Sequence, residues 1–145
     1  MSDKALPKLK NNAPSSKLED RAATLTEPGP GFLPPLIPHN FLALPQDQSS
    51  LENAKIALIP VPYDSTTSFR SGSREGPEAM ITASYGLEDY DFELDLDVSE
   101  IGIHTTSALE PHMGGPGLMT ERIKAVVGSY IGMGKTVGLL GGEHS

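Results

Sequence analysis

Residues Ile56 to Val61 form a nearly continuous apolar run, Ile-Ala-Leu-Ile-Pro-Val. Such a run suits a β-strand buried on both faces, which is typical of parallel sheets covered by helices. Pro60 lies near the end of the run, where the loss of one hydrogen-bond donor matters least. Shorter apolar runs at Ile101–His104 and Val137–Leu140 are expected to be further strands.

Two helices are expected between these strands. Pro77 suits the first turn of a helix, because the N–H that it lacks has no intrahelical partner there. The expected apolar stripe of this helix consists of Ala79, Met80, Ala83 and Leu87. The second helix follows the turn Gly114–Gly117 and stops at Gly134. Its apolar residues recur at helical spacing, namely Ile123, Val126, Val127, Tyr130 and Ile131.

In the segment from Asp89 to Val98, acidic residues alternate strictly with apolar or aromatic ones. This pattern predicts a strand with one acidic and one apolar face. The order strand, helix, strand, helix, strand predicts a fold of the α/β class with a parallel sheet. Ligands of such sheets bind beyond the carboxyl ends of the strands. That edge is expected to carry the loop Tyr63–Gly76 and the segment Gly141–Ser145.

Residues 1–45 are predicted to be a disordered or extended proline-rich tail, and residues 46–145 to be the folded part. Each proline between Pro28 and Pro38 removes a backbone donor and biases the preceding residue toward extended geometry. The alternative is an extended strap that docks on the folded part. The apolar residues available for docking are Phe32, Leu33, Leu36, Ile37, Phe41 and Leu42.

The composition argues against several classes of function. The net charge is −8 and Lys and Arg are not clustered, so no nucleic acid and no membrane is expected as a partner. The absence of cysteine excludes disulfides, thiolate metal sites and cysteine nucleophiles. No apolar run approaches the roughly 20 residues that cross a bilayer, and the N-terminal segment does not resemble a secretory signal. A cytoplasmic location is therefore expected.

Two ligand-binding motifs are incomplete. Gly134-Lys135-Thr136 resembles the end of a phosphate-binding loop, but Ser129 stands where the first glycine is required. Asp95 and Asp97 resemble the start of a calcium loop, but Glu100 stands at the position that needs glycine. A helix stop and a solvated acidic face explain these two segments better.

Three of the four histidines are predicted to have no ligand role. His39 and His112 lie in loop segments and are expected at the surface. His104 ends a predicted strand and is expected to be a hydrogen-bonded histidine at the sheet edge, with a position facing the site as the alternative.

The fourth histidine, His144, lies in the segment Leu139–Ser145, Leu-Leu-Gly-Gly-Glu-His-Ser. The two glycines let the backbone turn sharply after the strand, because no Cβ is in the way. His144 is then held at the carboxyl edge of the sheet, where imidazole is a suitable ligand for a divalent transition metal. This segment resembles the first signature of the arginase/agmatinase, or ureohydrolase, family.

The resemblance continues in collinear order over roughly residues 40–145. Pro60–Ser68, followed by Gly72–Pro77, is similar to the first strand, loop and helix of the family. Asn40–Pro45 resembles bacterial agmatinase-like members. The remaining similar segments are Tyr85–Glu93, Ile101–Thr105 and Leu109–Pro111.

The resemblance implies the N-terminal part of an α/β/α sandwich with a mostly parallel sheet. It also implies two Mn²⁺ ions per subunit, which activate water to attack the carbon of a guanidino substrate and release urea and an amine. Of the metal ligands of the family, only His144 is present, because Asp-Ala-His-x-Asp and Asp-x-Asp-x-x-Asp-Pro do not occur. No catalytic and no cofactor-binding residue is assigned within the chain, which is expected to be an inactive fragment of a homo-oligomeric enzyme.

Agmatine is the expected substrate, with arginine, guanidinobutyrate and formiminoglutamate as alternatives. An alternative of a different class is a non-catalytic fragment that binds full-length subunits through its sheet or helices. Three strands leave an apolar edge and face of the sheet uncovered, which favours either aggregation or a partner segment.

Overall fold

The strand predicted at residues 56–61 is the middle strand of a three-stranded parallel sheet with the order β4-β1-β5. In the computed structural model, which describes residues 34–144, β1 (Ile56–Val61) pairs with β4 (Ile103–Thr105) and with β5 (Thr136–Gly141). Ile56 faces Ile103 in β4 and Thr136 in β5. All three predicted buried strands, and their parallel arrangement, are thus confirmed.

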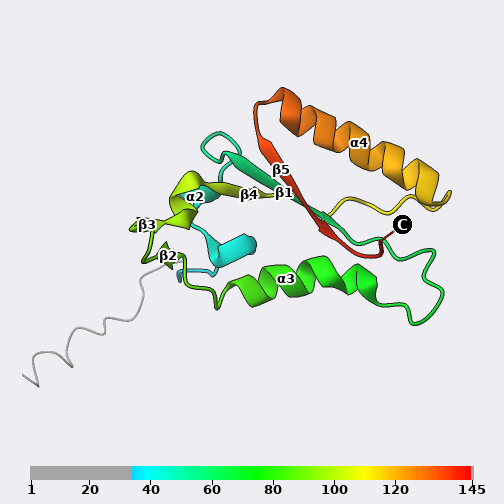
Figure 1. Ribbon diagram of the computed structural model, residues 1–145, viewed down its shortest axis with the longest axis horizontal. Helices are drawn as coiled ribbons and strands as arrows, with labels where there is room; N and C mark the ends of the chain where they lie inside the picture. The colour runs from blue at the N-terminus through cyan, green and yellow to red at the C-terminus, as the bar shows by residue number, and fades with distance from the viewer. Residues whose placement is uncertain (1–33, 145) are drawn as a thin grey trace, which may run out of the picture. The chain divides into compact units, whose positions relative to one another are not determined.

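The helices α3 (Gly76–Ser84) and α4 (Pro116–Gly132) lie on opposite sides of this sheet (Figure 1). Alternate side chains of a strand point to opposite faces, so β1 packs against both helices. Ile59 and Val61 belong to the main apolar core, which includes Met119 of α4. The arrangement is the layered α/β fold that the resemblance implied.

The predicted apolar stripe of α3 is wrong. Met80 and Leu87 are 40% and 60% exposed, whereas the buried residues of the helix are Pro77, Ile81 and Ser84. These three residues also recur at helical spacing, so periodicity alone offered two possible faces. Ser84 is accommodated inside because its hydroxyl donates to the carbonyl oxygen of Ile81 at 2.6 Å.

The predicted stripe of α4 is correct for four of its five residues, which pack against the core: Ile123, Val126, Val127 and Tyr130. Ile131 instead is 59% exposed. Met119, which the prediction omitted, is only 2% exposed and is among the largest fully buried side chains. The buried face of the helix therefore begins one turn earlier than its β-branched residues indicate.

The single strand predicted from Asp89 to Val98 is wrong. The segment forms a small antiparallel hairpin of β2 (Tyr90–Asp91) and β3 (Leu96–Asp97). The Asp91 carboxylate accepts hydrogen bonds from the backbone N–H groups of Glu93 and Leu94, at 2.9 and 3.0 Å. Aspartate side chains readily stabilise turns in this way, in competition with strand pairing of the backbone. The alternating sequence pattern gives no sign of this competition.

Short helical turns connect the larger elements. They are the 3-10 turns η1 (Phe41–Ala43), η2 (Ser73–Glu75) and η3 (Val98–Ile101), and the four-residue helix α2 (Gln46–Ser49). Within residues 34–144, no helix is both long and apolar enough to cross a membrane.

The predicted tail, residues 1–45, lies outside the described residues up to position 33. Chain contacts divide the molecule into Met1–Leu36 and Ile37–Ser145, and the fold described here belongs to the second unit. Within that unit, Leu42 N–H donates to Ser84 Oγ at 2.8 Å, and Leu44 is buried. Residues 41–44 therefore pack on the folded part, as the strap alternative proposed for Phe41 and Leu42.

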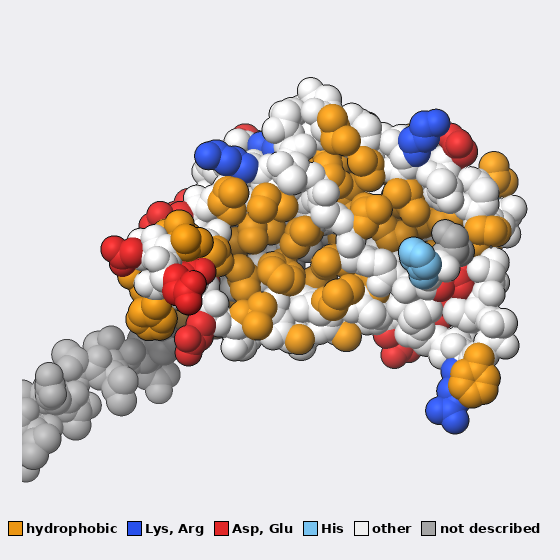
Figure 2. Space-filling view, in the orientation of Figure 1, with side chains coloured by type: hydrophobic (Ala, Val, Ile, Leu, Met, Phe, Trp, Pro, Cys, Tyr) orange, Lys and Arg blue, Asp and Glu red, His pale blue; other side chains and the backbone are white. Residues whose placement is uncertain are grey.

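Hydrophobic side chains gather on the surface over the sheet between α3 and α4 (Figure 2). β5 is an edge strand of the described sheet, and its Leu139 is 47% exposed. The hydrogen-bonding groups on the free side of β5 face no other strand among the described residues. This surface corresponds to the uncovered apolar edge that three strands were expected to leave.

Candidate functional site

The segments that follow β1 and β5 meet at the carboxyl edge of the sheet, as the sequence predicted. Glu143 N–H donates to the carbonyl oxygen of Tyr63 at 2.8 Å. A Cβ atom on Gly142 would overlap the same carbonyl group, so only glycine permits this approach. The second glycine of the Gly-Gly-Glu-His motif is thus explained by a contact with the loop Tyr63–Gly76.

The Glu143 side chain joins the same two segments a second time. Thr66 N–H lies 3.1 Å from each carboxylate oxygen of Glu143, and the Thr66 hydroxyl donates to Oε1 at 2.5 Å. Both donors come from one residue of the loop. These solvent-exposed hydrogen bonds link the loop to the turn after β5 in addition to the backbone contact.

Asp64 organises the start of the loop. Its carboxylate accepts from Arg74 Nη2 at 2.6 Å and from Gly72 N–H at 2.9 Å, while its side chain is only 2% exposed. The hydrogen bond from Arg74, followed by that from Gly72, lowers the pKa of the Asp64 carboxyl below its ordinary value of 3.8. The ionised Asp64 therefore folds the loop back on itself and fixes the entrance to α3.

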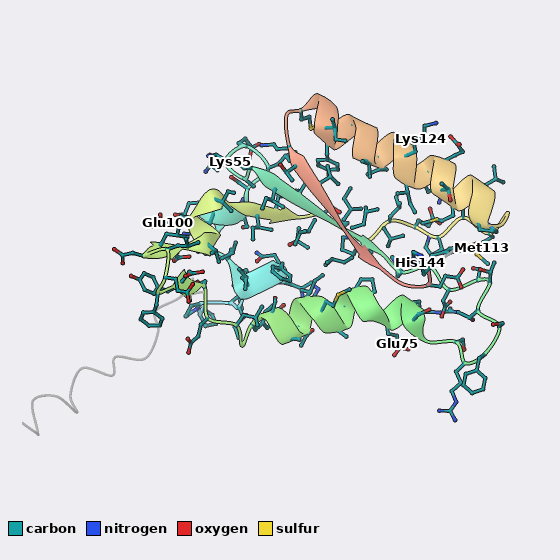
Figure 3. The ribbon with its side chains drawn as sticks, viewed as in Figure 1. Lys55, Glu75, Glu100, Met113, Lys124 and His144 are labelled. Atoms are coloured by element: carbon teal, nitrogen blue, oxygen red, sulfur yellow. The ribbon has the colours of Figure 1, made fainter. Side chains whose placement is uncertain are left out.

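His144 is exposed at the end of β5, beside the loop (Figure 3). It lines an open hollow of about 340 Å³ together with Glu143 and five loop residues, Thr66, Thr67, Ser68, Phe69 and Arg70. The imidazole is therefore accessible at the edge where ligands of parallel sheets bind. Its predicted role as a metal ligand stays a prediction.

The other three histidines lie elsewhere in contacts of their own. His104 Nδ1 lies 2.9 Å from the carbonyl oxygen of Ser49, which confirms the hydrogen-bonded position expected for it. His39 is exposed, with Nε2 3.3 Å from a carboxylate oxygen of Glu78. His112 Nδ1 accepts from Gly114 N–H at 3.0 Å.

The residues that the structure describes do not hold a metal ion by themselves. Between positions 34 and 144, no group of three or more His, Asp or Glu side chains is arranged around a common point. Glu143, the acid nearest to His144 in the sequence, is engaged by Thr66. At the carboxyl edge of the sheet, the described residues present one exposed histidine, His144.

A model of the arginase family matches residues 54–145, which is more than half of the chain. The chain belongs to the arginase family. It is 36% identical over 103 residues to the N(1)-aminopropylagmatine ureohydrolase of Synechocystis sp., covering 67% of this chain and 33% of that protein. It is 34% identical over 93 residues to the agmatinase of Bacillus subtilis, covering 64% of this chain and 32% of that protein.

A solved structure supports the same fold for this arginase-family chain. The agmatine ureohydrolase of Thermoplasma volcanium superimposes with a TM-score of 0.63 at 25% identity, over 73% of this chain and 35% of that chain. The chain thus spans about a third of the length of the relatives it matches.

Sequence reasoning did not identify the connecting residues of this edge, Asp64, Thr66 and Arg74. Asp64 carried a usable signal, because a carboxylate placed three residues beyond a buried strand commonly binds a ligand or anchors a loop. Thr66 carried no such signal, since its partner Glu143 lies far along the sequence, in the turn after β5.

Proposed function

We propose that the whole protein to which this chain belongs is an agmatinase-like ureohydrolase, which hydrolyses a guanidino compound to urea and an amine. The observation that carries the proposal is the position of His144. It lies exposed at the carboxyl edge of a parallel sheet, in the Gly-Gly-Glu-His segment of a chain of the arginase family.

Enzymes of the arginase family are generally manganese-dependent. When bound, a pair of Mn²⁺ ions lowers the pKa of water and stabilises the charge that develops in the transition state. In this proposal His144 contributes one neutral nitrogen ligand. Gly142 and the loop Tyr63–Gly76 hold the backbone next to it, and the remaining ligands are carboxylates and histidines outside the described residues.

Agmatine is the first substrate proposed, because the relatives include agmatinases. N(1)-aminopropylagmatine is the second, because relatives with that name match over similar stretches at similar identity. Both are cations with a guanidino group, and a net charge of −8 favours the approach of a cation. Arginine, guanidinobutyrate and formiminoglutamate are the further alternatives to compare.

The test is urea release by the whole protein with added Mn²⁺, with each substrate offered at the same concentration. His144→Ala is expected to lose bound Mn²⁺ and most of the activity while the melting temperature changes little. His104→Ala is the matched control and should keep its Mn²⁺, because His104 bonds to Ser49 away from this edge. Two Mn²⁺ per subunit in an active His144→Ala protein would exclude the ligand role.

A non-catalytic role for the 145-residue chain is the second candidate, favoured by the exposed edge strand β5. In this proposal the chain alone releases no urea and instead associates with full-length subunits. Mixing the chain with the whole protein, followed by size-exclusion chromatography, tests it. Co-elution supports this role, whereas separate elution and turnover by the chain alone each exclude it.

A further inference from the structure

Glu143 immediately precedes His144 at this edge. A carboxylate next to a histidine is a natural second ligand for a hard divalent ion such as Mn²⁺. In the structure, however, both of its oxygens lie within hydrogen-bond distance of Thr66 N–H, and Oε1 also accepts from the Thr66 hydroxyl. The Glu143 carboxylate is therefore already hydrogen-bonded to the loop.

We propose that Thr66 and Glu143 form a clamp that sets the position of His144, and that Glu143 is a positioning residue and not a metal ligand. The role of His144 in this inference rests on the proposed function. The clamp itself rests on the hydrogen bonds between the two segments.

The backbone contact beside the clamp explains how it acts on His144. Glu143 is held on its backbone side by Tyr63 and on its side-chain side by Thr66. The backbone contact fixes the path of the chain at Glu143, and the side-chain contact fixes the orientation of this residue. His144 is the next residue, so both contacts restrict its position. Because the side chain of His144 is exposed, its own packing contributes little to holding it in place.

The loop carries its half of the clamp in a defined position. Asp64 lies two residues before Thr66. It is held by Arg74 and Gly72, which lie on the other side of the loop tip. The Thr67 hydroxyl lies 3.3 Å from the carbonyl oxygen of Asp64 and so bonds within the loop instead of reaching Glu143. Adjacent threonines thus have different tasks, and Thr67 provides a matched control.

The first experiment uses the 145-residue chain and requires no metal. Trypsin cleavage after Arg70, at the exposed loop tip, and hydrogen exchange of the Glu143 amide both report opening of the clamp. Thr66→Val is expected to speed both by roughly tenfold, because it removes a charge-assisted hydrogen bond. Thr66→Ser should restore protection, and Thr67→Val should behave like the unmodified chain.

Circular dichroism melts of all variants separate clamp opening from general unfolding. Equal cleavage and exchange rates in Thr66→Val and the unmodified chain would overturn the clamp. Equal acceleration in Thr66→Val and Thr67→Val would assign the effect to general loosening of the loop and would also overturn it.

The second experiment uses the whole protein and measures bound Mn²⁺. Glu143→Gln keeps an acceptor oxygen for Thr66 but removes the charge, so a positioning residue retains the metal and a ligand loses it. Loss of Mn²⁺ as complete as in His144→Ala would overturn the positioning role. If the unmodified whole protein binds no Mn²⁺ and releases no urea, the proposed function fails, and the first experiment still decides the clamp.

Discussion

Arg74 Nη2 lies 2.6 Å from a carboxylate oxygen of Asp64, and the two groups differ sharply in exposure, with side chains 60% and 2% exposed. The exposed partner is the cation, so the buried anion depends on a side chain that solvent reaches freely. The first prediction follows from this dependence.

The free energy of unfolding should fall in acid. The pKa of the Asp64 carboxyl is lowered in the folded state, chiefly by the hydrogen bond from Arg74. Its stabilising contribution is therefore fully present above the ordinary carboxyl pKa of 3.8, and it is lost as the pH falls below that value through the folded-state pKa. Urea titrations between pH 7 and pH 2 measure the loss. Arg74→Met should reduce stability at pH 7 and flatten the acid dependence, whereas Arg70→Met, in the exposed loop tip, should do neither.

Gly142→Ala should destabilise the fold by about 1–3 kcal/mol, as overpacking does elsewhere. The new methyl group would overlap the Tyr63 carbonyl, and a backbone atom cannot rotate away as a flexible side chain would. Gly141→Ala is the matched control, because a Cβ there meets no atom within 4 Å. Thermal melts of the two variants decide, and equal melting temperatures would contradict the predicted contact.

Met119→Ala should cost about 2–5 kcal/mol, the usual range for truncation of a fully buried side chain. Met119 packs with Ile59, Val61 and Tyr63 in the core. Ile131→Ala, on the same helix, should cost far less because Ile131 is 59% exposed. Urea denaturation of both variants gives the comparison, and a larger loss in Ile131→Ala would show that the buried face of α4 is assigned wrongly.

Ser84→Ala should cost about 1–3 kcal/mol, because it leaves the Leu42 N–H without its acceptor. The variant tests whether residues 41–44 are held on the folded part. Hydrogen exchange at the Leu42 amide should accelerate together with the loss of stability. Ser129→Ala is a suitable control, since Ser129 also bonds to a helix carbonyl but is exposed. Unchanged exchange at Leu42 would count against the docking of this segment.

The sheet and its crossovers were predictable because burial on both faces leaves a strong trace in the sequence. Ile56–Val61 has no polar residue, and the helix pattern at Ile123–Ile131 identified the helix and four of the residues that pack on the core. The face of α3 was less predictable, because apolar residues on a short helix fit two stripes equally well. The tertiary contact of Ile81, and not periodicity, selects between them.

For the site, the sequence predicted individual motifs but not the contacts between them. Gly142 and His144 were marked by their order after a buried strand, and the loop Tyr63–Gly76 by its composition. The clamp between Thr66 and Glu143 was not predictable, because it depends on the register by which β5 pairs with β1. Asp64 and Arg74 are likewise joined through the fold of the loop, which no periodic pattern encodes.

β1 is the middle strand of the sheet, so each of its two edges pairs with another strand, and these two partners are synthesised at different times. β1 emerges first, its partner β4 follows later, and the second partner β5 is complete only when Gly141 has been added. During that interval an apolar strand has an open edge, which is the kind of surface that aggregates or recruits chaperones. Pairing between such distant segments is also slow, because the intervening chain must be ordered first. The nascent protein therefore keeps one edge of β1 unpaired throughout the synthesis of α4.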